Sequence, residues 1–174
     1  MKSINNYISE KLQISSKGKH YNYFPKTKEE LQDIIQQRIE KEGNECDLND
    51  IYISEITDIS NLFMHSKFNG DISKWDVSNV TDMSYLFYNS KFNGDILKWN
   101  VSKVENMYYM FCKSKFNQDI SSWDVSNVIY MTAMFRESEF NQDISNWDVS
   151  NVEDMAGIFD ASPLEGKEKE WWGK

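Results

Sequence analysis

Cysteine is scarce in this sequence, and its scarcity excludes several kinds of site. Only two cysteines occur among the 174 residues, Cys46 and Cys112, in unlike surroundings far apart in the chain. A disulfide framework needs several cysteines, and a CxxC metal or redox motif needs two of them three positions apart. We therefore expect both thiols to be free.

Long apolar runs and catalytic motifs are missing as well. The start, MKSINNYISEKLQI, lacks the apolar stretch of a signal peptide, and no segment approaches the roughly eighteen apolar residues of a membrane span. His20 and His65 have no metal-spaced partner, and no GxSxG, HExxH, Walker or GxGxxG pattern occurs. We expect a cytoplasmic protein that does not contact the membrane, is not an enzyme, and binds no cofactor or metal.

Positive charge is also scarce in most of the chain. The net charge is −9, and residues 47–164 carry eight Lys or Arg against eighteen Asp or Glu, whereas the segments on either side are nearly neutral. Acidic surfaces repel a phosphate backbone. Direct binding of nucleic acid is therefore not expected.

What the sequence does contain is one phrase written four times. FNGDISKWDVSNV begins at residue 68 and returns in related form at 92, 116 and 140, a constant period of 24 residues. Three columns of identical residues result: Phe68, Phe92, Phe116 and Phe140; Trp75, Trp99, Trp123 and Trp147; Met83, Met107, Met131 and Met155. Such a period is typical of repeat proteins, in which stacked neighbours complete the core, so we predict that the Phe and Trp columns are buried.

Within one copy the apolar spacing changes. Trp75 and Val77 alternate with polar residues, as in a strand, whereas the apolar residues from 80 to 87 are spaced like the stripe of a short helix. Each copy is therefore predicted to form a strand, a turn, a short helix and a second turn. Five such repeats fit residues 47–164, with a C-terminal cap or tail in residues 165–174.

Residues 1–46 are predicted to form a helical N-terminal cap region. Thr27 and Glu30 match a capping box ahead of an apolar stripe, and Gly43 is a natural stop, which predicts a helix over residues 28–42. Apolar residues between 4 and 12 indicate a second short amphipathic helix. Capped ends are compatible with a monomer.

The repeats resemble a known family. The spacing I-x-x-W-x-V-x-x-V resembles the leucine-rich-repeat skeleton, and FNxDISxWDVSNVxxMxxMF resembles the BspA-like repeats of bacterial surface antigens and mycoplasma lipoproteins, over residues 48–164. The resemblance implies an α/β right-handed solenoid of short parallel strands and short helices, used for binding and without catalytic residues. Its surface members imply an adhesin or antigen module, an alternative that requires an export signal.

The N-terminal segments resemble a different group. INNYISEKLQI and the following FPKTKEELQDIIQQRIEKEGNECDLNDI are similar to small proteins encoded by phages and prophages. This resemblance implies an inhibitor inside a bacterial cell that binds a host defence enzyme, such as an anti-CRISPR protein acting on an RNA-guided nuclease.

Two columns of acidic residues invite two interpretations. They are Asp71, Asp95, Asp119 and Asp143, and beside them Asp76, Asn100, Asp124 and Asp148. A ladder of carboxylates suits calcium, which would make the chain a calcium-dependent ligand-binding protein, or general acid catalysis. Alternatively, each Asp accepts N–H bonds within its own turn. Strict repetition favours the turn, because a catalytic or metal site needs one distinctive place.

Positions where the copies disagree are the better candidates for a partner-binding site. Variation concentrates on the segment predicted to be helical, and it gives a predicted protein interface of Tyr85, Tyr88, Tyr108, Tyr109, Tyr130 and Arg136. Grouped surface tyrosines are typical anchors of interfaces. The alternative is that these rings cover the neighbouring repeat.

A secondary acidic face is predicted at Asp76, Asp124 and Asp148. Such a face could meet the basic groove of a nuclease and compete with nucleic acid. The simpler interpretation, a solvated face, is favoured.

Overall fold

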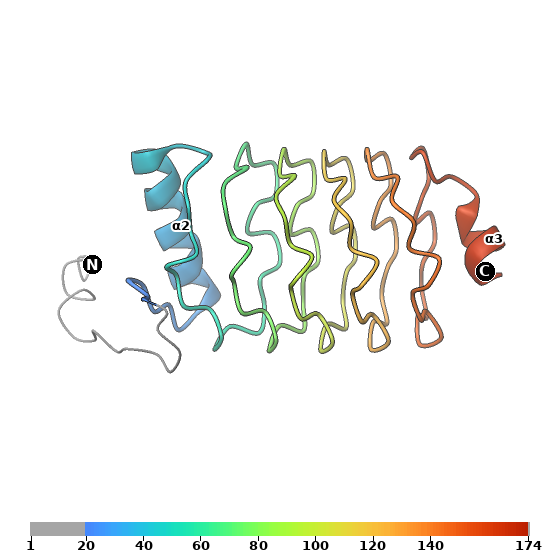
Figure 1. The fold of residues 1–174 in the computed structure, drawn as a ribbon, viewed down its shortest axis with the longest axis horizontal. Helices are drawn as coiled ribbons and strands as arrows, with labels where there is room; N and C mark the ends of the chain where they lie inside the picture. The colour runs from blue at the N-terminus through green and yellow to red at the C-terminus, as the bar shows by residue number, and fades with distance from the viewer. Residues whose placement is uncertain (1–19, 174) are drawn as a thin grey trace.

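The computed structural model describes residues 20–173, which form a row of stacked coils with a helix at each end (Figure 1). Helix α2 (Lys28–Glu42) lies at the N-terminal end and helix α3 (Lys167–Trp172) at the C-terminal end. Within the described residues, no helix is both long and apolar enough to cross a membrane.

Helix α2 begins and ends where its local sequence requires. The Thr27 side chain accepts a hydrogen bond from the Glu30 N–H at 3.2 Å, and Gly43, at φ 90°, ends the helix. Leu31 and Ile35 are buried in the same apolar core as the first coils. The predicted helix over residues 28–42 is confirmed. The helix predicted between residues 4 and 12 lies outside the described residues.

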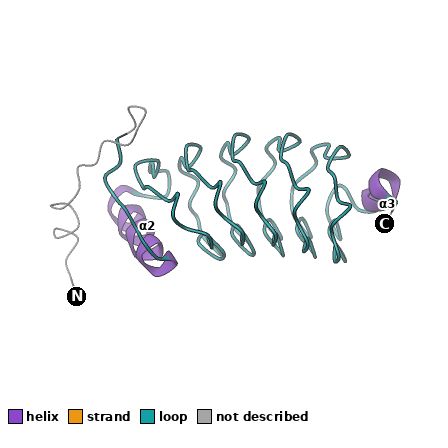
Figure 2. Cartoon of the chain, turned by 90° about the horizontal axis from the view of Figure 1, so that it is seen from below, coloured by secondary structure: helices purple, strands orange, loops and turns teal. Residues whose placement is uncertain are grey.

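The predicted α/β solenoid of the leucine-rich-repeat type is wrong. Between residues 43 and 166 the chain contains turns and isolated bridges but neither helix nor extended strand, so no parallel sheet forms (Figure 2). Consecutive coils are joined by isolated parallel bridges between residues 24 apart: Asp47 with Asp71, Asp58 with Asp82, Asp82 with Asn106, Asn106 with Tyr130, and Tyr130 with Asp154.

Backbone conformation explains why the apolar stripe from 80 to 87 is not helical. Tyr85 (φ 55°) and Asn89 (φ 50°) are left-handed, and residues at the same positions of the other coils are left-handed too. A left-handed residue interrupts a right-handed helix. The Tyr85 N–H donates to the Tyr108 carbonyl at 2.9 Å and the Asn89 N–H to the Cys112 carbonyl at 2.8 Å. Backbone N–H groups that would bond within the same helix therefore donate to the next coil instead.

The core is a set of aromatic ladders that runs along the stack. Phe68 and Phe92 stack with ring centroids 6.2 Å apart and ring planes within 2°, and Trp75 and Trp99 stack at 6.4 Å. A further ladder joins buried rings 5.6 to 5.9 Å apart: Phe63, Phe87, Phe111, Phe135 and Phe159. The prediction that the Phe and Trp columns form the core is confirmed, and the period of 24 is the length of one coil.

Candidate functional site: a tyrosine cluster and a side groove

The acidic columns are occupied by turn-forming side chains. Asp119 accepts the Ser121 N–H at 2.9 Å, which holds the pKa of its carboxyl below the usual range, and its equivalents in the other copies accept in the same way. The turn interpretation of these columns is confirmed. Within residues 20–173, no three His, Cys, Asp or Glu side chains gather in a way that could hold a metal ion.

The predicted secondary acidic face has the same local chemistry. Asp76, Asp124 and Asp148 are exposed, and each accepts the N–H two residues further on, at 3.0 to 3.2 Å. Hydrogen bonds from Ser126 and Ser150 lower the pKa of the Asp124 and Asp148 carboxyls. Asp124 and Asp148 are therefore anionic at neutral pH, and the face remains a prediction as a binding surface.

Four of the predicted interface residues come together in one surface group, called here the tyrosine cluster: Tyr85, Tyr88, Tyr108 and Tyr109. Tyr85 stacks on Tyr109 with ring centroids 5.4 Å apart, and Tyr108 lies 4.5 Å from Tyr109. Tyr88 lies 5.7 Å from Tyr85 and 6.2 Å from Tyr109. All four side chains are half-buried, so part of each ring surface faces solvent.

The repeat itself positions this cluster. Tyr85 and Tyr109 occupy the same position of successive coils, and both are left-handed at φ 55°. A bulky residue with positive φ is uncommon and carries a conformational cost. Burial, followed by a hydrogen bond between the Tyr85 and Tyr108 hydroxyls, raises the pKa of Tyr85 to about 12. The Tyr85 ring is therefore a neutral phenol at any physiological pH.

One contact of the cluster was not predicted from the sequence. The His65 ring meets the Tyr88 ring edge to face with centroids 5.3 Å apart, and His65 Nδ1 lies 2.9 Å from Asn89 Nδ2. His65 precedes the first clear copy of the repeat, which begins at Phe68. It lies 24 residues before Asn89, so the repeat period predicts that it is next to Asn89 in the neighbouring coil, and therefore beside Tyr88.

Two predicted interface residues lie apart from the cluster. Among the described residues Tyr130, 45% exposed, has no ring contact with the four tyrosines, and it occupies the bridge position opposite Asn106. Arg136 is exposed, and its Nε lies 3.5 Å from the Glu137 carboxylate. Buried Cys112 holds the position between Tyr88 and Arg136 in successive coils, and burial raises the pKa of its thiol to about 11. Both cysteines are free, as predicted, and both are buried.

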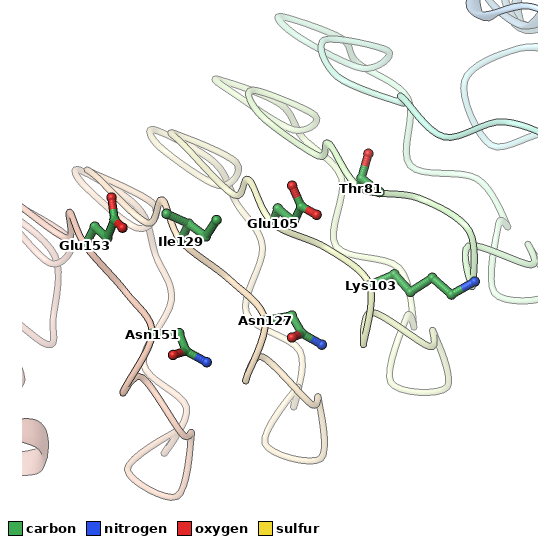
Figure 3. Close-up of a pocket in the computed structure, with 7 residues that line it drawn as sticks. All are labelled: Thr81, Lys103, Glu105, Asn127, Ile129, Asn151 and Glu153. Carbon is green, nitrogen blue, oxygen red and sulfur yellow. The ribbon is translucent and has the colours of Figure 1, made fainter.

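A groove of about 510 Å³ follows one side of the stack (Figure 3). Its lining comes from two rows of side chains on successive coils: Thr81, Glu105, Ile129 and Glu153 in one, and Lys103, Asn127 and Asn151 in the other. The sequence interpretation did not single out these residues, although Ile129 is the one apolar residue in its row.

Comparison with known proteins places the chain in a family without assigning its activity. The model of a mycoplasma protein family of unknown function, DUF285, matches residues 29–115 and 112–173. DUF285 is related to the BspA-like repeat proteins of mycoplasmas, which confirms that part of the predicted resemblance. No curated protein and no solved structure matches the chain.

Proposed function

We propose that this chain, which belongs to the mycoplasma protein family DUF285, is a non-catalytic protein-binding module whose contact surface is the tyrosine cluster. The observation that carries the proposal is the gathering of four partly exposed tyrosines from two adjacent coils. Tyrosine anchors protein interfaces because its ring offers large contact area at little entropic cost and its hydroxyl can pair with polar groups.

Other copies argue against a purely structural role for these rings. At the position of Tyr85 and Tyr109 the next coil has Ala133, at φ 52°, and the one after has Gly157, at φ 62°. The Ala133 N–H still donates to the Ala156 carbonyl at 3.0 Å, so the same bond between coils forms without a ring. Because the framework does not require tyrosine here, a partner is the better explanation.

For the partner we propose a bacterial defence enzyme, such as an RNA-guided nuclease, that the protein inhibits by binding. The acidity of residues 47–164 supports this class of target, since such enzymes carry basic grooves for nucleic acid. Exposed Asp76, Asp124 and Asp148 would strengthen the encounter with such a groove. The N-terminal resemblance to phage and prophage proteins points to the same class.

The alternative function is a module of a surface adhesin or antigen. Its support is the relation of DUF285 to BspA-like repeat proteins, a resemblance that implies surface antigens. On this alternative the same tyrosine cluster would contact an extracellular ligand.

The test takes its substitutions from another copy of the repeat, where the same residues are already compatible with the fold. A variant with Tyr85→Ala, Tyr108→Thr and Tyr109→Ala carries residues that the copy beginning at Phe116 already has at these positions, Thr132 and Ala133. The immobilised full chain and this variant are each exposed to lysate of a defence-competent bacterium, and circular dichroism verifies that both are folded. We expect one host enzyme to be retained by the parent chain, inhibited in a nuclease assay, and bound about tenfold more weakly by the variant.

Equal retention by a folded variant would exclude the tyrosine cluster as the contact surface. If the parent chain retains no host enzyme but binds immobilised extracellular matrix proteins, the adhesin alternative replaces the inhibitor.

A further inference from the structure

The row that lines the side groove breaks the repeat at one place. Successive coils there present Thr81 with Asp82, Glu105 with Asn106, and Glu153 with Asp154, but the copy that begins at Phe116 presents Ile129 with Tyr130. Ile129 is half-buried and Tyr130 is 45% exposed. Framework residues are fixed by stacking, so a single apolar and aromatic pair in an otherwise polar row is a distinctive place on a regular surface.

Acidic residues flank this pair on both sides. Ile129 lies between Glu105 and Glu153 (Figure 3). The Ile129 N–H donates to the Glu105 carbonyl at 2.8 Å, and the Glu153 N–H donates to the Ile129 carbonyl at 2.9 Å. The backbone therefore fixes the three residues in register on consecutive coils.

The two carboxylates are not neutralised within the groove. In the described part of the chain, no side-chain hydrogen bond or ion pair involves Glu105 or Glu153, and both residues are exposed. The one cation of the lining, Lys103, donates to the Asn79 amide oxygen at 2.7 Å. The groove thus offers an apolar centre between two available negative charges.

The opposite row makes this lining rigid before anything binds. The Asn127 amide donates to the Ser102 carbonyl and the Asn151 amide to the Ser126 carbonyl, both at 2.7 Å. Side chains that are held by such bonds lose little further freedom when a ligand binds.

We propose that this groove docks a basic amphipathic helix of a protein partner, at a surface separate from the tyrosine cluster. Adjacent bridged segments lie about 5 Å apart, so Glu105 and Glu153 are about 10 Å apart along the stack. A helix rises ~1.5 Å per residue, so two cations seven positions apart have the same spacing, with apolar side chains three and four positions along facing Ile129 and Tyr130. The charge and apolar pattern of such a helix complements the groove.

The probe is a synthetic helical peptide of about sixteen residues, with Arg at two positions seven apart, Leu at the third and fourth positions after the first Arg, and Ala or Gln elsewhere. Binding to the full chain is measured by fluorescence anisotropy at two salt concentrations. The control peptide has Glu in place of both Arg. We expect the basic peptide alone to bind, more weakly at high salt because exposed charge pairs are screened.

The variant Ile129→Glu/Tyr130→Asn copies Glu105 and Asn106, and is expected to fold and to lose about tenfold in affinity. Glu105→Gln/Glu153→Gln is expected to weaken binding and reduce its salt dependence. The matched control is Leu97→Ser, which replaces another exposed apolar residue with the serine of its column and should bind unchanged.

Failure of the wild-type chain to bind the peptide, or unchanged binding by a folded Ile129→Glu/Tyr130→Asn variant, would overturn the proposal. The tyrosine variant described above separates the two surfaces. If it loses peptide binding while the groove variant retains it, the peptide lies on the tyrosine cluster and the groove is not the docking site.

Discussion

Gly70 is a residue whose identity follows from one close approach of the backbone. A Cβ atom at this position would lie 2.0 Å from the Cys46 carbonyl oxygen and 2.9 Å from the Cys46 nitrogen. Neither atom can move without shifting the first coil. Gly70→Ala is therefore expected to lower the free energy of unfolding by about 3 kcal/mol or more, as severe overpacking does, measured by urea denaturation.

Its control is Gly94→Gln, one coil further along. The backbone atom nearest to a Cβ there is the Gly70 oxygen at 3.4 Å, and Gln118 already occupies the equivalent position of the next coil. The substitution should change stability by less than about 1 kcal/mol. If both variants lose the same free energy of unfolding, the close approach of the Cys46 backbone is not the reason that position 70 requires glycine.

Tyr85 gives the tyrosine cluster a pH signature. Burial and the Tyr108 hydroxyl raise its pKa from 10.0 to about 12. Because the folded pKa is raised, Tyr85 stabilises the fold below pH 10, and this contribution is lost as the pH rises from 10 through about 12. Absorbance titration of phenolate should include a step near pH 12, and Tyr85→Phe should remove that step.

Tyr108→Phe tests the cause of the shift. Removal of the Tyr108 hydroxyl deletes a hydrogen bond that raises the pKa of Tyr85, so the late step should move toward pH 10. An unchanged step would mean that burial accounts for the whole shift.

At the scale of one coil, the indole column ties each copy to the one before it. The buried Trp123 Nε1 donates to the Ile96 carbonyl at 3.2 Å, and the other three tryptophans of the column bond in the same way. Trp123→Phe removes this bond between coils and leaves the core underfilled, while the Ile96 carbonyl keeps the Trp99 N–H as a donor. We expect the free energy of unfolding to fall by about 2 to 4 kcal/mol, measured by chemical denaturation.

Trp172→Phe in α3 is the matched control. In the described residues the Trp172 Nε1 is buried without a hydrogen-bond partner, so its removal deletes no such bond. The ring stays stacked against Phe159, where the centroids are 5.8 Å apart. This variant should cost less than about 1 kcal/mol, and a loss equal to that of Trp123→Phe would refute the role of the carbonyl bond.

The sequence was a good guide to which residues are buried and a poor guide to the elements that bury them. The 24-residue columns predicted the aromatic core, and Thr27, Glu30 and Gly43 predicted α2, because a period and a cap are local signals. Apolar spacings of three and one, however, arise from consecutive turns as readily as from a helix. Tyr85 and Asn89 are left-handed without being glycine, and the Tyr85 column contains a glycine, Gly157, only in the last coil.

The candidate site, like the fold, was predicted in part: the sequence groups four of its tyrosines correctly but misplaces Tyr130. Tyr85 and Tyr109 share a column, so their contact follows from the period, and Tyr88 and Tyr108 lie next to them. Tyr130 belongs to the same predicted helical segment, which is why the sequence alone groups it with them. In the coils its position belongs to the bridge column beside the side groove.

At the scale of the molecule, the apolar core is continuous from α2 to α3. Its bridges and ladders link residues 24 apart, so each coil depends on its two neighbours, and the ends are closed by Leu31 and Ile35 on one side and by Trp171 and Trp172 against Phe159 on the other. In such an architecture, stability is approximately a sum of unit and nearest-neighbour contributions.

This additivity predicts the effect of lengthening the chain. A second copy of residues 116–139, inserted directly after residue 139, adds one coil with its own Phe, Trp and Met and creates one more stacked interface. Thermal unfolding followed by circular dichroism should shift upward by several degrees, and small-angle scattering should show a molecule longer by about 5 Å. An insertion of the same residues in scrambled order should lower the melting temperature, because a coil out of register cannot accept the hydrogen bonds of its neighbours. If the ordered and scrambled insertions behave alike, the coils do not stabilise one another through the register of the repeat.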